Sequence, residues 1–141
     1  MKRIFSVLFA LAVVLATTST LYAQCSNATL TGNYPFIYSG MNAPGHSVTG
    51  KNTFGNAAVG VFTFDGAGNL SLTYTDVSNG QVISTSVPDT GTYTVNSDCT
   101  GSLTDTTIDV HFNIATVGGG AEFFAIQTDE GNTDTFDAKK Q

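Results

Sequence analysis

The chain has 141 residues, with 11 Asp and Glu against 5 Lys and Arg, and its formal net charge is −6 at pH 7. This acidity argues against nucleic acid and anionic membranes as partners, because both repel a negatively charged surface. Two of the five basic residues are Lys2 and Arg3, so the part of the chain after residue 23 carries 3 − 11 = −8 and has no arginine.

The first 23 residues have the layout of a secretory signal peptide. Lys2 and Arg3 precede an apolar run at 4–16, and a polar stretch then leads to Leu-Tyr-Ala at residue 23. The apolar run is shorter than the roughly 20 residues of a membrane-spanning helix. We therefore expect cleavage after Ala23, a secreted or periplasmic protein with no membrane span in its mature part, and a single domain over 24–141. A lipid anchor on Cys25 is the alternative, although Gln24 is a poor residue at that place.

After residue 24 the sequence pattern is that of β-strands. Thr, Val, Phe, Tyr and Ile alternate with small polar residues, and Gly, Asn and Asp interrupt the runs every 8 to 12 residues. Such spacing is typical of an all-β sandwich or barrel, and no significant helix is expected. The predicted strands are 29–39, 56–65, 69–78, 81–88, 90–96, 102–107, 108–116, 121–128 and a possible last one at 134–139.

Four of the connections have the composition of tight hairpins. They are Asp65–Asn69, Ser78–Gly80, Asn96–Gly101 and Val117–Gly120. Glycine adopts positive φ readily, and Asn-Gly suits a type I′ turn. Consecutive hairpins make an antiparallel meander, and a meander of about eight strands closes into a small β-barrel without exposed edges.

The segment 40–55 is too long for a hairpin turn and rich in turn-forming residues. Loops of this length in a compact domain are usually lids, binding loops or disordered. Two interpretations stay open: a lid over the mouth of the barrel, or a surface loop without a role.

The chain contains two cysteines, Cys25 and Cys99. An even number of cysteines in an oxidising compartment indicates a disulfide first. A Cys25–Cys99 bond would close a long loop and stabilise the fold by up to about 4 kcal/mol. A reactive thiol or a metal ligand is the alternative for Cys99.

Motifs for metal or cofactor binding are weak. Cys25, Cys99, His46 and His111 lack the spacing of a zinc site. The stretch Asp65–Asn69 lacks the alternating oxygen ligands of a calcium loop, and its glycines join strand to strand, not strand to helix as in a phosphate loop. We expect no metal and no cofactor.

The aromatic residues are the best candidates for ligand contacts. Tyr34, Phe36 and Tyr38 share one face of the first predicted strand, and Tyr74 shares a face with Leu70 and Leu72. Such residues either fill the core or line a barrel interior that holds one small apolar ligand, with tyrosine hydroxyls orienting it. The candidate ligand-binding residues are Tyr34, Phe36, Tyr38, Tyr74, Tyr93 and His111.

His111 allows two interpretations. In the predicted strand 108–116, Ile108, Val110 and Phe112 share one face, whereas Asp109 and His111 share the other. His111 either faces solvent or forms an acid–base pair with Asp109 that points into a polar cavity.

Three motifs resemble those of a group of small exported bacterial proteins of unknown function. They are Cys-x-x-Ala-Thr-Leu-x-Gly-x-Tyr-x-Phe at 25–36, Gly-x-Phe-x-Phe-Asp-Gly-x-Gly-x-Leu at 60–70, and Gly-Thr-Tyr-x-Val-x-x-Asp-Cys-Thr-Gly at 91–101. The layout is also similar to allene-oxide-cyclase-like, or calycin-like, barrels. The first resemblance implies pairing of Cys25 with Cys99, and the second implies an apolar substrate inside the barrel, without placing active-site residues.

The resulting expectation is an exported, disulfide-linked β-barrel that binds a small apolar molecule or serves as a structural envelope protein. The alternative is a cyclase or isomerase whose cavity folds its substrate into a reactive shape. An assembling surface protein is a third possibility, and the oligomeric state stays open.

Overall fold

The structure is a computed structural model that describes residues 24–42 and 54–141. The predicted signal peptide at 1–23 and most of the segment 40–55 lie outside the described residues. Residues 40–42 and 54–55 of that segment belong to strands, so the connection between the first two strands is shorter than predicted.

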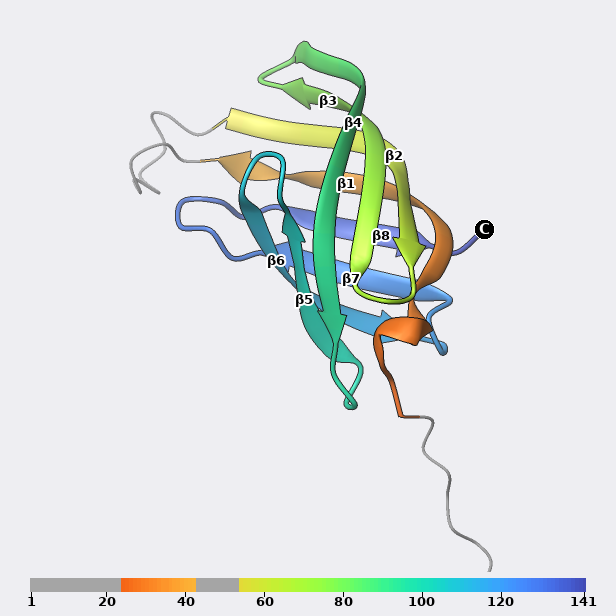
Figure 1. The fold of residues 1–141 in the computed structure, drawn as a ribbon. Helices are drawn as coiled ribbons and strands as arrows, with labels where there is room; N and C mark the ends of the chain where they lie inside the picture. The colour runs from red at the N-terminus through yellow and green to blue at the C-terminus, as the bar shows by residue number, and fades with distance from the viewer. Residues whose placement is uncertain (1–23, 43–53) are drawn as a thin grey trace, which may run out of the picture.

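Eight antiparallel strands form a closed barrel, as predicted (Figure 1). Each strand pairs with its neighbours in sequence, and β1 closes the barrel against β8. A short 3-10 helix, η1, precedes the first strand. The elements are η1 (Asn27–Thr29), β1 (Thr31–Asn42), β2 (Phe54–Asp65), β3 (Asn69–Ser78), β4 (Gln81–Val95), β5 (Thr100–Asp105), β6 (Val110–Val117), β7 (Glu122–Gln127) and β8 (Thr135–Lys139).

The predicted strands 81–88 and 90–96 are one strand, β4. Pro88 keeps its place opposite Thr73 on β3, and the pairing continues on both sides of it. The irregularity instead falls near Ser86, whose φ is 52°, where the register with β3 shifts around Asp76. The strand takes up extra residues as a bulge and does not end.

The strand predicted at 108–116 was wrong at its start, because β6 begins at Val110, two residues later. Asp105 Oδ1 accepts the backbone N–H groups of Thr107 at 2.9 Å and of Ile108 at 3.4 Å. These bonds make a turn of residues 106–109, which ends in Asp109 with φ 56°. Ile108 is therefore in a turn and exposed, not on the buried face of a strand.

One end of the barrel is closed by packed aromatic side chains. Phe64 makes edge-to-face contacts with Tyr34, Tyr93 and Phe123, with ring centroids 5.3, 4.9 and 5.5 Å away. Tyr34 and Phe123 are 0% exposed, and Leu30 beside them is also fully buried. We call this region the closed end.

Hydrogen bonds from two buried tyrosines hold the segment around η1 and the β6–β7 turn at the closed end. The Tyr93 hydroxyl donates to the carbonyl oxygens of Asn27 and Leu30 at 3.0 and 2.9 Å, and the Tyr34 hydroxyl donates to that of Gly120 at 2.5 Å. A Cβ at Gly120 would lie 2.0 Å from the Thr29 carbonyl oxygen, so the close approach requires glycine there.

Cys25 and Cys99 form a disulfide, with Cα atoms 5.0 Å apart. The bond joins the segment before η1 to the turn between β4 and β5, a separation of 74 positions. The question of a free thiol or metal-bound Cys99 is thereby answered: Cys99 is oxidised. In residues 24–42 and 54–141, no helix has the length and apolar character needed to cross a bilayer.

Candidate functional site

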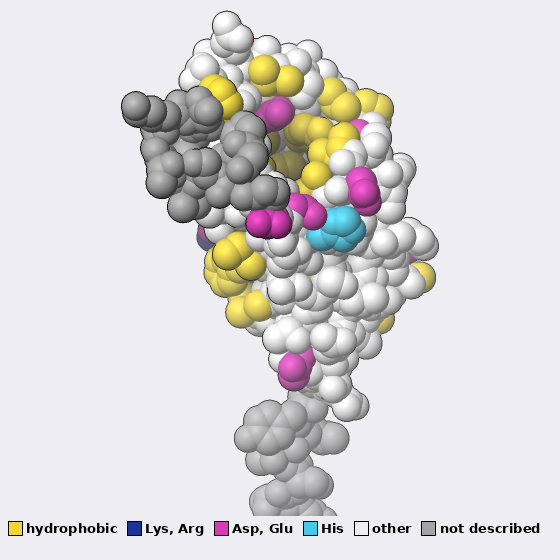
Figure 2. All heavy atoms as spheres, turned by 90° about the vertical axis from the view of Figure 1, so that its left-hand side faces the viewer, with side chains coloured by type: hydrophobic (Ala, Val, Ile, Leu, Met, Phe, Trp, Pro, Cys, Tyr) yellow, Lys and Arg dark blue, Asp and Glu magenta, His cyan; other side chains and the backbone are white. Residues whose placement is uncertain are grey.

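The other end of the barrel contains a cavity of about 210 Å³. Figure 2 shows the hollow on this side of the molecule, with hydrophobic side chains inside it and acidic side chains and a histidine near its edge. The cavity walls come from β1, β2, β3, β5, β6, β7 and β8 and the β5–β6 turn. We call this region the open end.

The floor of the cavity is aromatic. Phe36 and Phe62 pack with ring centroids 4.5 Å apart, and Phe136 contacts Phe36 at 5.1 Å and Phe112 at 4.8 Å. These rings separate the cavity from the closed end, because Phe62 also contacts Phe64 and Phe123. A cavity floor of this kind favours contact with the apolar part of a small molecule.

Above the floor, the inward faces of the strands become polar. Along a strand, residues two apart point to the same side, and each polar residue here lies an even number of positions from a buried apolar one. The residues are Asn42 on β1, Asn56 on β2, Asp76 on β3, Asp89 on β4, Asp105 on β5, Gln127 on β7 and Asp134 just before β8.

Two tyrosines of the cavity donate hydrogen bonds to buried carboxyl groups. Tyr38 donates to Asp134, which is 0% exposed, and Tyr74 donates to Asp89 at 3.0 Å. Burial raises the pKa of both tyrosines well above the ordinary value, and the hydrogen bond to the neighbouring carboxylate is the second largest cause of this shift. Both hydroxyls are therefore neutral donors at physiological pH.

Burial also raises the pKa of three carboxyl groups at the open end, Asp76, Asp105 and Asp134. For Asp105, backbone N–H groups of the β5–β6 turn oppose this effect, and the nearby Asp89 adds to it. No lysine or arginine is among the described residues that line the cavity. The negative charges of Asp76 and Asp105 thus have no cationic partner among these lining residues.

Several oxygen atoms around the cavity have no hydrogen-bond donor among the described residues. They are Oδ1 of Asn42, Asn56 and Asp134 and Oε1 of Gln127. Gln127 is only 8% exposed and lines the cavity. Its Nε2 donates to Asp129 Oδ2 at 3.1 Å. Because a carboxylate only accepts, this assignment makes the amide oxygen Oε1 the atom without a hydrogen bond.

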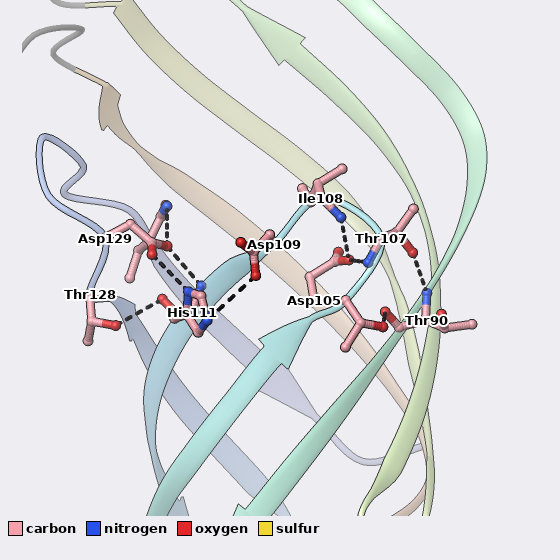
Figure 3. A network of polar contacts seen from close by, with 10 residues as sticks. Thr90, Asp105, Thr107, Ile108, Asp109, His111, Thr128 and Asp129 are labelled. Carbon is pink, nitrogen blue, oxygen red and sulfur yellow. Dashed lines mark hydrogen bonds and ion pairs between the residues drawn. The ribbon is translucent and has the colours of Figure 1, made fainter.

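A second polar network lies on the rim, outside the cavity (Figure 3). His111 Nδ1 lies 2.9 Å from Asp129 Oδ1, and the His111 backbone N–H donates to Asp129 Oδ2 at 2.8 Å. Burial raises the pKa of Asp129, but the hydrogen bonds from His111 and Gln127 outweigh it and leave that pKa below its ordinary value. Asp109 is 3.8 Å from His111 Nε2, with a side chain that is 91% exposed.

The six predicted site residues separate into three groups. Phe36, Tyr38 and Tyr74 line the cavity. Tyr34 and Tyr93 are buried in the closed end, and the structure does not bring them to the cavity. His111 faces outward with its side chain 49% exposed, so its contact with Asp109 lies on the rim and not inside a polar cavity.

The inward carboxylates were missed by the sequence reasoning. The signal was present in the alternation: Asp76 continues the face of Leu72 and Tyr74, and Asp105 continues the face of Leu103. A carboxylate on the apolar face of a strand is unusual, because burying an unpaired charge is costly. That conflict marks a candidate site.

Among the described residues, no three His, Cys, Asp or Glu side chains come together in a way that could hold a metal ion. In comparisons with known proteins, no family model, no curated protein and no solved structure matches this chain.

Proposed function

We propose that this protein is an exported binding protein that takes a small, mainly apolar molecule into the open end of its barrel. The observation that carries the proposal is the cavity of about 210 Å³ above an aromatic floor. An apolar cavity of roughly 150 Å³ accommodates benzene, so this one has room for a body somewhat larger than one ring. The disulfide supports the export part, because such bonds persist in oxidising compartments.

Native mass spectrometry of the exported, disulfide-bonded protein tests the binding. We expect a reproducible adduct that is lost on denaturation. The cavity-filling variant Ala58→Phe should lose this adduct because Ala58 lines the cavity. The matched control Ala57→Phe places the same ring on the outer face of β2 and should keep it.

A different result would remove the proposal. If the protein shows no adduct, and a panel of small apolar molecules leaves its melting temperature unchanged, the open end does not bind such molecules. A structural envelope role, in which the barrel acts through its outer surface, would then replace it.

An isomerase or cyclase is the second candidate, and the buried acidic groups favour it. Carboxyl groups whose pKa is raised by burial, such as Asp76 and Asp105, are suited to proton transfer nearer to neutral pH. The molecule recovered by mass spectrometry would be incubated with the protein and followed by chromatography. Conversion that Asp105→Asn abolishes without a lower melting temperature would establish the enzyme, and an unchanged molecule would leave a carrier.

A further inference from the structure

The cavity gathers negative charge and hydrogen-bond acceptors around an aromatic floor. Asp76 on β3 and Asp105 on β5, two strands apart in the barrel, both line it, and Gln127 on β7 adds an amide oxygen. Asp105 and Gln127 flank β6: Asp105 pairs with Val110, and Gln127 pairs with Phe112, two positions further along. The two side chains therefore point into the cavity from the strands on either side of β6.

Asp105 has hydrogen bonds from the turn N–H groups but no countercharge, and the Gln127 amide oxygen has no donor among the described residues. Asp105 is 5% exposed, and among the described lining residues there is no lysine or arginine to pair with it. Gln127 is 8% exposed, and its Oε1 accepts no hydrogen bond from the described residues. A buried carboxylate without a countercharge and a buried amide oxygen without a donor both destabilise a fold, so a ligand that supplies positive charge and donors would relieve both.

We propose that the ligand class of this cavity is a small organic ammonium ion, with its charged head between Asp76, Asp105 and the Gln127 amide oxygen and its apolar body on the aromatic floor. This inference rests on the proposed binding function. An ammonium group has several N–H donors and no acceptor, which matches a set of sites that only accept. Tyr38, Tyr74 and Phe136 also line the cavity, and aromatic rings attract a cation placed over their faces.

The same geometry argues against the simpler ligands. A metal ion needs several ligands that converge, and the described residues offer no such group of three. An anionic ligand would meet Asp76 and Asp105 with repulsion, and a neutral ligand would leave their charge unbalanced. An ammonium ion with a ring-sized body fits both halves of the cavity.

The test compares three ring compounds of similar size and different charge: benzylamine, benzyl alcohol and benzoate, titrated calorimetrically at neutral pH and physiological salt. We expect benzylamine to bind the protein about tenfold more tightly than benzyl alcohol, as expected for a charge-assisted hydrogen bond in a partly buried site. Benzoate should not bind measurably.

Variants assign the effect to the cavity. Asp105→Asn keeps the oxygen that the turn N–H groups use but loses the charge, and we expect it to remove most of the preference for benzylamine. Asp76→Asn provides the same test from β3, two strands away in the barrel, if the first variant folds poorly. The matched control is Asp109→Asn, which removes the same charge from an exposed position in the same turn and should leave the preference intact.

The outcomes separate the inference from the proposed function. Benzyl alcohol binding as tightly as benzylamine would overturn the ammonium inference and leave a binding protein. An equal loss of benzylamine affinity in Asp109→Asn and Asp105→Asn would also overturn it, because the attraction would then be a general effect of net charge. No binding of any probe, together with no adduct in native mass spectrometry, would overturn both.

Discussion

The two ends of this barrel are built from the same strands but serve opposite requirements. At the closed end, the Tyr93 hydroxyl finds two backbone acceptors, and Phe64 packs between Tyr34 and Phe123. At the open end, Tyr38 and Tyr74 donate to buried carboxylates, and the Gln127 oxygen has no donor among the described residues. Well-packed aromatic rings and satisfied hydroxyls are thus found at one end, and polar groups without partners among the described residues are concentrated at the other.

Aspartates report the same difference through their pKa values. Asp65, the last residue of β2 before the β2–β3 turn at the closed end, accepts hydrogen bonds from the Asn69 side chain and from backbone N–H groups, and these lower its pKa to about 2. At the open end, burial raises the pKa of Asp76 and Asp105. The charged form of an aspartate side chain is thus stabilised at the closed end and destabilised at the open end.

The largest predicted effect is at the closed end. Phe123→Ala removes a fully buried ring that contacts Tyr34, Phe62 and Phe64, and we expect it to lower the free energy of unfolding by about 3–5 kcal/mol. The control is Phe124→Ala, one position along and 45% exposed, which should have a much smaller effect. Urea unfolding followed by circular dichroism measures both, and equal losses would mean that the closed end is not the stable core.

Loss of the disulfide comes next. Replacing Cys25 and Cys99 together by Ser should lower the free energy of unfolding by about 2–4 kcal/mol, because the bond closes a long loop in the unfolded chain. Unfolding of the double variant is compared with that of the oxidised protein. Ligand binding at the open end should persist in the fraction that stays folded; its loss would show that the two ends are coupled.

A smaller effect is expected for Tyr93→Phe. The substitution keeps the ring against Phe64 but deprives the Asn27 and Leu30 carbonyl oxygens of a donor. We expect a loss of about 1–3 kcal/mol, the range for a buried group left without its partner. A melting temperature equal to that of the unmodified protein would show that the two hydrogen bonds of the Tyr93 hydroxyl do not help to hold η1 in place.

The smallest and most specific prediction is that the two ends respond to pH in opposite ways. A carboxyl group whose pKa is raised by folding stabilises the fold below its unfolded pKa and loses that contribution as the pH rises through its folded pKa. Asp105→Asn should therefore raise the melting temperature of the unliganded protein by more at pH 7 than at pH 4. Asp65, with its lowered pKa, contributes above pH 3.8 and loses its contribution as the pH falls toward about 2.

Asp65→Asn should accordingly lower the melting temperature at pH 7 and have less effect in acid. Differential scanning calorimetry across this pH range measures both variants. Parallel pH profiles for Asp105→Asn and Asp65→Asn would contradict the difference between the two ends.

Much of the fold was predictable because local signals agreed with one another. Alternating β-branched and aromatic residues, interrupted by Asp-Gly and Asn-Gly turns, leave few arrangements other than a meander. The Cys25–Cys99 pairing followed from an even cysteine count. The start of β6 was predicted wrongly because Ile108 continues the apolar alternation, whereas the Asp105 side chain captures its backbone N–H in a turn.

The site was predicted only in part, because alternation gives the face of a residue and not its depth in the barrel. Tyr34 and Tyr38 share the inward face of β1, yet one lies in the closed end and the other in the cavity wall. Depth depends on the pairing register around all eight strands, which is a property of the closed sheet. His111 was placed on the correct alternation, but its main partner, Asp129, is 18 positions away.

The closure of the barrel also bears on how the chain folds. Seven of the eight strand pairings join consecutive strands and can form from local hairpins, whereas the β1–β8 pairing joins opposite ends of the domain through only four residue pairs, from Phe36–Ala138 to Ser39–Thr135. Long-range pairings form late because their loop-closure entropy is the largest. Until that seam forms, β1 and β8 are free edges on which a second molecule can add, so newly made protein should aggregate most readily before its last hydrogen bonds are in place.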